Sequence, residues 1–150
     1  MNYTLTKKYT IEETLRFFAE CAYNVGEKVQ DGISTKDRHI SECISSFLNS
    51  MNVYPVEFTP NCIYEPKSRR RWDIEIPSTQ DIKNLIFFAK NIYIKHEHNK
   101  GIIPSRQTMN TIDEFLIYCG SLRGVEIDIK ELRQVEKDCV AEIAAQGAQA

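Results

Sequence analysis

Hydrophobic residues recur at helical spacing over most of this chain. Between residues 11 and 32 they alternate at steps of four and three, which places them on one stripe of a helix; they are Ile11, Leu15, Phe18, Ala22, Val25 and Val29. Thr10 and Glu13 form a capping box before it. A second helix is expected from Ser34, and its apolar face consists of Ile40, Cys43, Ile44, Phe47, Leu48 and Met51.

The third helix is expected to lie at the centre of the fold. Ser78 is a suitable N-cap for a helix over residues 79–98, and Gly101 suits its end. Its middle is apolar over more than half of the circumference. We therefore expect the other helices to pack around it, with Phe88 and Ile92 in the core.

Two further helices are expected after Gly101. Ser105 caps the fourth, whose inward residues are Met109, Ile112, Phe115, Leu116, Cys119 and Leu122. Asp128 starts the fifth, and its stripe is Leu132, Val135, Cys139 and Ile143. The last residues, 143–150, offer little apolar anchor, so we expect them to fray.

The period of the pattern changes between residues 53 and 76. Three short runs are separated by Pro and Asn residues, and in the last run apolar and charged side chains alternate: Trp72, Ile74 and Ile76 against Arg71, Asp73 and Glu75. Alternation bounded by turn residues is typical of antiparallel strands. The sequence thus predicts an α+β fold, with a three-stranded meander inserted between the second and third of four to five helices.

Composition is that of one ordinary globular domain, residues 1–150, with 42% hydrophobic and 27% charged residues. The net charge of −2 gives no general attraction to nucleic acid or an anionic membrane. Five cysteines are an odd number and widely spaced, unlike a secreted disulfide framework. With no apolar leader or membrane span in the sequence, we expect reduced thiols and a cytoplasmic location.

The candidate binding residues form a basic turn: Lys67, Arg69, Arg70, Arg71 and Trp72. Four cations beside an indole can neutralise phosphates and stack a base, or bind an acidic protein surface. The alternative is a solvated hairpin whose arginine stems cover apolar surface.

Metal and catalytic motifs are weak. His96 and His98 are two residues apart, so on a helix they point about 200° apart and cannot bind one ion together. The Glu65-Pro66-Lys67 run resembles the Glu-x-Lys of some metal-dependent nucleases, but Pro66 interrupts the strand that such a site needs. No Gly-rich phosphate loop is present. We therefore predict no catalytic residue, metal or cofactor.

By elimination, the sequence favours a small non-catalytic binding protein that occludes or tethers another macromolecule, as inhibitors and immunity-type proteins of mobile elements do. A protein partner is favoured over nucleic acid. The first alternative is a nucleic-acid-binding module that uses the turn over residues 67–72. The second is a metal-dependent hydrolase or nuclease.

Overall fold

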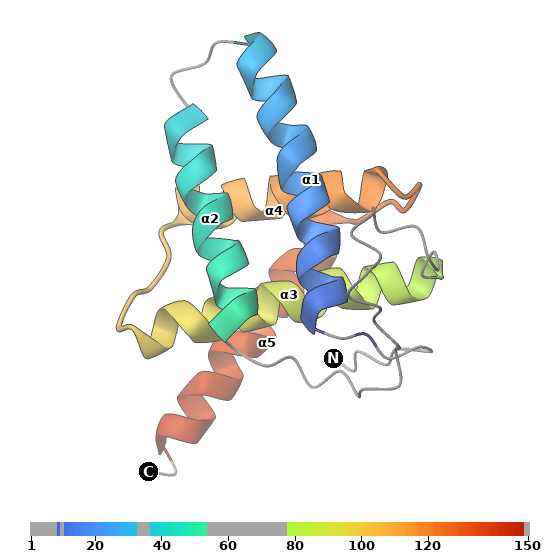
Figure 1. Cartoon of the computed structure of the whole chain (residues 1–150). Coiled ribbons are helices and arrows are strands. Elements are labelled where there is room, and N and C mark those ends of the chain that lie inside the picture. Colours follow the sequence, from blue (N-terminus) through green and yellow to red (C-terminus); the bar gives the residue numbers. More distant parts are fainter. Residues whose placement is uncertain (1–8, 10, 33–36, 54–77, 149–150) are drawn as a thin grey trace.

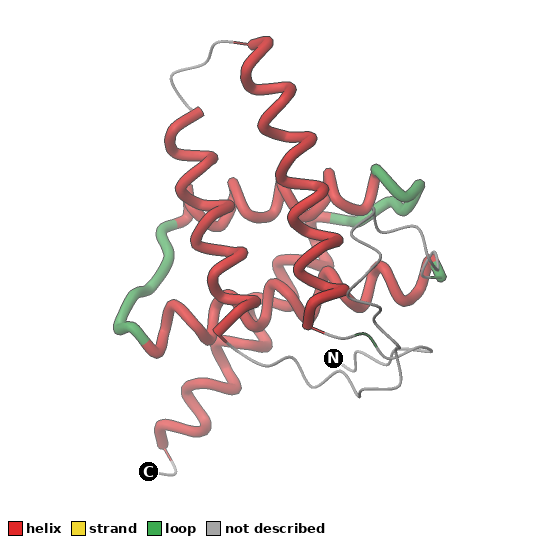
Figure 2. Tube along the Cα trace, in the orientation of Figure 1, coloured by secondary structure: helices red, strands yellow, loops and turns green. Residues whose placement is uncertain are grey.

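The computed structural model describes residues 9, 11–32, 37–53 and 78–148. These residues form five helices, with loops from the third to the fourth and from the fourth to the fifth, and no strand among them (Figure 2). The helices are α1 (Ile11–Gly32), α2 (Asp37–Val53), α3 (Thr79–Asn99), α4 (Arg106–Ser121) and α5 (Ile129–Ala148).

The five helices are arranged in three layers (Figure 1). Helices α1 and α2 form an antiparallel pair that runs across α3 and α4, which are antiparallel to one another. Helix α5 packs mainly against α3, behind it in the view of Figure 1. Helix α3 contacts α2, α4 and α5, while α4 contacts all four other helices, so the central position expected for α3 alone is shared with α4.

The buried face of α3 differs in detail from the expected one. Leu85, Ile86 and Tyr93 are fully or almost fully buried, whereas Phe88 and Ile92 are half-buried at the edge of the core. Phe88 and Ile92 are one helical turn apart, so they share a side of α3. Because three other helices pack around α3 and take its remaining sides, the expectation that this pair lies in the core is wrong.

An aromatic cluster joins four of the helices. The Phe18, Phe47 and Phe115 rings come from α1, α2 and α4, and each was expected on an inward stripe. Phe47 lies 5.1 Å from Phe18, 5.5 Å from Phe115 and 6.2 Å from Tyr93 of α3, measured between ring centroids. The contacts of Phe47 with Phe18 and Phe115 are edge-to-face, and such contacts add to the free energy gained by burying the rings.

The predicted helix starts at α3, α4 and α5 are confirmed. The Ser78 hydroxyl accepts a hydrogen bond from the Asp81 N–H at 3.1 Å, and the Ser105 hydroxyl accepts one from the Thr108 N–H at 3.1 Å. The Asp128 carboxylate accepts one from the Lys130 N–H at 2.9 Å. Each side chain satisfies a backbone donor that the first turn leaves unpaired.

The described residues form an all-α fold, so the predicted α+β class is wrong. Val53, expected to begin the meander, is the last residue of α2. Extending an existing helix by one residue adds a hydrogen bond without a new nucleation step, which outweighs the small strand preference of valine. The rest of the expected meander, residues 54–76, lies outside the described residues, as do the expected helix starts at Thr10 and Ser34.

The structure defines where α4 and α5 end. Helix α5 continues to Ala148, through the segment expected to fray, and its fraying in solution stays a prediction. Leu122, expected on the inward stripe of α4, is the C-cap residue of this helix and is 41% exposed, so that expectation is wrong. Within the described ranges, no helix is long and apolar enough to cross a bilayer.

Candidate functional site

An apolar groove lies where the end of α3, the loop from α3 to α4 and the second half of α5 meet. It encloses about 270 Å³. Apolar side chains form most of its wall, and its two ionisable residues are His98 and Glu136. The isoleucine, valine and methionine residues of the wall are Ile94, Ile102, Ile103, Met109, Val140 and Ile143.

The loop side of the groove is built by the turn that ends α3. Gly101 has φ +77°, a left-handed conformation that glycine adopts without strain. Its N–H donates to the His98 carbonyl at 2.9 Å, and the Ile102 N–H donates to the Glu97 carbonyl at 2.9 Å. This pair of bonds is a Schellman motif, which reverses the chain sharply after a helix. It directs Ile102 and Ile103 into a loop instead of a helix face, and Ile103 is 87% exposed.

Helix α5 supplies the opposite side of the groove. Of its predicted inward stripe, Leu132, Val135 and Cys139 are fully buried, whereas Ile143 is only partly buried. Val140 lies next to that stripe, lines the groove and is 54% exposed. Large aliphatic side chains exposed on both walls of one hollow form a contiguous apolar patch, and such patches mark interaction sites.

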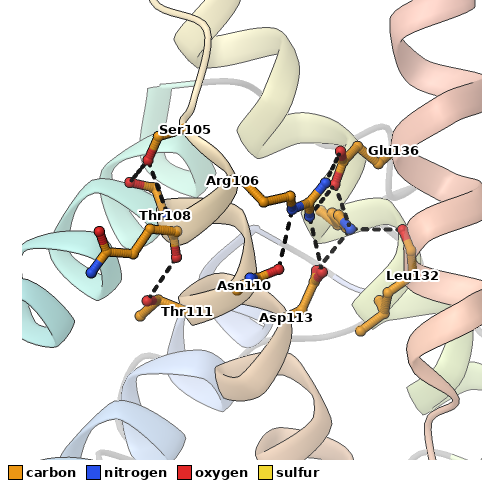
Figure 3. A network of polar contacts seen from close by, with 10 residues as sticks. Ser105, Arg106, Thr108, Asn110, Thr111, Asp113, Leu132 and Glu136 are labelled. Carbon is orange, nitrogen blue, oxygen red and sulfur yellow. Dashed lines mark hydrogen bonds and ion pairs between the residues drawn. The ribbon is translucent and has the colours of Figure 1, made fainter.

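A cluster of charged side chains lies beside the groove and closes the junction of α3, α4 and α5 (Figure 3). Lys90 of α3 is completely buried, and its ammonium lies 2.7 Å from the Asp113 carboxylate and 3.3 Å from the Glu136 carboxylate. It also donates a hydrogen bond to the Leu132 carbonyl at 2.7 Å. Three helices are therefore linked through one ammonium group.

Arg106 completes this cluster from the solvent side. Its guanidinium donates two hydrogen bonds to the Glu136 carboxylate, at 2.8 and 3.0 Å, and a third to the Asn110 amide oxygen at 3.2 Å. It lies 3.8 Å from the Asp113 carboxylate. Two cations and two carboxylates thus balance one another, and a two-bond arginine–carboxylate pair is among the strongest that side chains form.

The pKa values of the two carboxylates in the cluster are shifted in opposite directions. Burial raises the pKa of Asp113, and the hydrogen bond and charge of Lys90 offset only part of that effect. Burial also acts to raise the pKa of Glu136, but the hydrogen bonds from Arg106 and the charge of Lys90 outweigh it, so that pKa is lowered. Glu136 is therefore the carboxylate whose charged form the fold stabilises.

This cluster is built to hold helices together. Lys90 and Asp113 are closed off from solvent, and a catalytic group must reach its substrate. Among the described residues, no group of three or more histidine, cysteine, aspartate or glutamate side chains could hold a metal ion. The groove next to the cluster, in contrast, is open and apolar, which suits binding.

A second hollow of about 190 Å³ lies between α1 and α2. Its wall consists of apolar residues and small polar ones, and the long aliphatic members are Val25, Ile40, Ile44 and Leu48. Among the described residues no charged side chain lines it, whereas His98 and Glu136 line the groove beside α5. The groove beside α5 is the stronger candidate.

The residues singled out from the sequence have different outcomes. Lys67, Arg69, Arg70, Arg71 and Trp72 lie outside the described residues, so their role stays a prediction. His96 is buried and His98 is exposed. The two imidazoles thus occupy different environments, in line with the helical geometry.

Sequence reasoning missed both the charged cluster and the groove. A signal for each was present. Lys90, Asp113 and Glu136 each interrupt or border an apolar stripe of a different helix, and buried charges require partners. Two consecutive isoleucines between Gly101 and Pro104 cannot both be buried by a helix that ends before them.

Comparison of this chain with protein-family models, with curated proteins and with solved structures found no match.

Proposed function

We propose that this protein is a small non-catalytic binding protein that occludes or tethers another macromolecule through the groove beside α5. The observation that carries the proposal is the exposure of Ile103 and Val140 on opposite walls of a hollow of about 270 Å³. Burying such side chains against a partner stabilises a complex by about 25 cal/mol per Å² of apolar surface, before the costs of association.

A protein partner is favoured over a nucleic acid. Among the described residues, no aromatic side chain lines the groove, and single-stranded nucleic acids are often held by stacking bases on aromatic rings. Aliphatic side chains and a proline suit the aliphatic or aromatic anchor of a protein segment. Nucleic-acid binding by the basic turn over residues 67–72 stays a separate prediction from the sequence.

A reducing compartment such as the cytoplasm is the proposed location. Four cysteines lie within the described residues, namely Cys21, Cys43, Cys119 and Cys139, and all four are buried free thiols. Burial raises the pKa of the Cys139 thiol to about 11. A buried thiol that stays protonated is a poor nucleophile, which fits a structural role.

The experiment compares matched aspartate variants of exposed aliphatic residues. Ile103→Asp and Val140→Asp place a charge in the groove, whereas Leu122→Asp places one at the exposed end of α4, away from its wall. Each immobilised variant is exposed to an extract of the source organism. Any protein retained by the wild type is identified, purified and titrated against all four chains by calorimetry.

We expect the retained protein to bind wild type and Leu122→Asp equally, and to bind both groove variants at least about tenfold more weakly, since a central anchor contributes more than about 1.4 kcal/mol. A change in the partner's own activity or location on binding would show occlusion or tethering. Unchanged affinity of both groove variants would contradict the proposal.

A further inference from the structure

A basic stripe runs along the exposed side of α5 and leads into the groove. Lys130, Arg133 and Lys137 are separated by three and four residues, and Val140 and Ala144 continue the same spacing. All five side chains are exposed. At this spacing they lie on one face of the helix, one turn after another.

The three cations of this stripe have no acidic partner among the described residues, unlike the other cations near the groove. Arg106 is bound to Glu136, and Lys95 lies 3.1 Å from Glu142. Asp128, which precedes the stripe, accepts a backbone hydrogen bond at the start of α5. The stripe therefore carries three positive charges in a chain whose net charge is −2.

We infer that the groove and the basic stripe of α5 together bind an acidic amphipathic helix of a partner protein. Its carboxylates lie over Lys130, Arg133 and Lys137, and its apolar side chains enter the groove beside Ile103 and Val140. This inference rests on the proposed function and specifies the chemistry of the partner.

The length and charge of this face of α5, from Lys130 to Ala144, match an acidic amphipathic helix. From Lys130 to Ala144 the face extends about 21 Å, the length of about four helical turns. An amphipathic helix presents anchors at steps of three and four, which matches such a face. A second copy of this chain that used its own α5 is a poorer fit, because its basic stripe would repel this one and the Glu131 and Glu142 carboxylates of α5 are already paired with Lys83 and Lys95.

The probes are two synthetic 18-residue peptides of helical design. Both carry leucines at steps of three and four at one end; the first carries glutamates over the other end, and the second carries lysines at the same positions. Binding to the full chain is measured by fluorescence anisotropy, and the contact is located from the methyl resonances of isoleucine and valine.

We expect the glutamate peptide to bind at least about tenfold more tightly than the lysine peptide, because complementary charge favours one partner and like charge rejects the other. It should shift the methyl resonances of Ile103 and Val140. The triple variant Lys130→Glu, Arg133→Glu, Lys137→Glu should reverse the order of the two peptides. If that variant unfolds, the triple glutamine variant should abolish the preference.

The inference is overturned if the two peptides bind equally, if the triple variant keeps the wild-type preference, or if the groove methyl groups do not respond. Stronger binding of a single-stranded oligonucleotide at the stripe, or self-association that covers the groove in sedimentation experiments, would also overturn it. The proposed function fails on a separate result, which is unchanged affinity of the Ile103→Asp and Val140→Asp variants for the captured partner.

Discussion

The charged cluster and the apolar groove are neighbours and share Glu136, but they differ in what they leave exposed to solvent. In the charged cluster, Lys90, Arg106, Asp113 and Glu136 are held against one another, and the two at its centre are inaccessible to solvent. In the groove, Ile103 and Val140 are left in solvent although a packed core lies a few residues away. The cluster pairs its charges with one another, whereas the groove leaves apolar side chains exposed.

The two regions should respond differently when a side chain is removed. Desolvating a charged pair is costly, so the cluster adds little net stability over an apolar junction, yet removing one member leaves an uncompensated charge. Removing an exposed aliphatic side chain, in contrast, changes the free energy of unfolding little. Stability measurements can therefore distinguish residues that hold the fold from residues available to a partner.

The largest effect is expected for Asp113→Ala. This change removes the closest counter-charge of a completely buried ammonium, so we expect the free energy of unfolding to fall by about 3–5 kcal/mol, measured by urea denaturation. The double variant Lys90→Met, Asp113→Leu is the control. It removes both charges, so its loss should be well below the sum of the two single losses. A loss under about 1 kcal/mol for Asp113→Ala would show that the cluster does not organise the junction.

A smaller loss of stability, which depends on pH, is expected for Glu136→Gln. Because the folded-state pKa of Glu136 is lowered below its ordinary value of 4.5, its charged form stabilises the fold at neutral pH. That contribution is lost as the pH falls through the lowered pKa. Asp113 has the opposite dependence, and its pKa is raised partly by the charge of Glu136. Removing that charge in Glu136→Gln therefore changes the Asp113 contribution as well, which offsets part of the expected effect.

The measurement is the difference in unfolding free energy between wild type and Glu136→Gln from pH 7 down to pH 3. We expect the wild type to be more stable at pH 7 and the difference to shrink once the pH falls below 4.5. A difference that is constant over this range would mean that the Glu136 charge is not stabilised by Lys90 and Arg106.

The sequence allowed the helical part of this fold to be predicted well, because its signals are local. Caps at Ser78, Ser105 and Asp128 depend on contacts within one turn, and the stripe of α5 depends on a fixed period. The half-burial of Phe88 and Ile92 depends on which sides of α3 its neighbours cover. The sequence of α3 does not contain that information.

The candidate site was harder to predict, because it depends on partners far apart in the chain. Lys90 and Glu136 are 46 positions apart, and Ile103 and Val140 line one groove from separate elements. A lysine in an apolar run indicates a buried charge, but the carboxylates that pair with it are fixed by the packing of α4 and α5. The basic turn over residues 67–72, which sequence analysis favoured, stays a prediction.

The smallest effect on stability is expected for Ile103→Ser, and it tests the groove side of the comparison. At 87% exposure this side chain has little surface buried in the fold, so the free energy of unfolding should change by no more than about 0.5 kcal/mol. Ile94→Ala, from a buried residue of the same wall, is the matched control and should cost about 2–5 kcal/mol. Both are measured by the same urea assay. If Ile103→Ser costs as much as Ile94→Ala, then Ile103 stabilises the folded chain, and its exposure no longer argues for a partner.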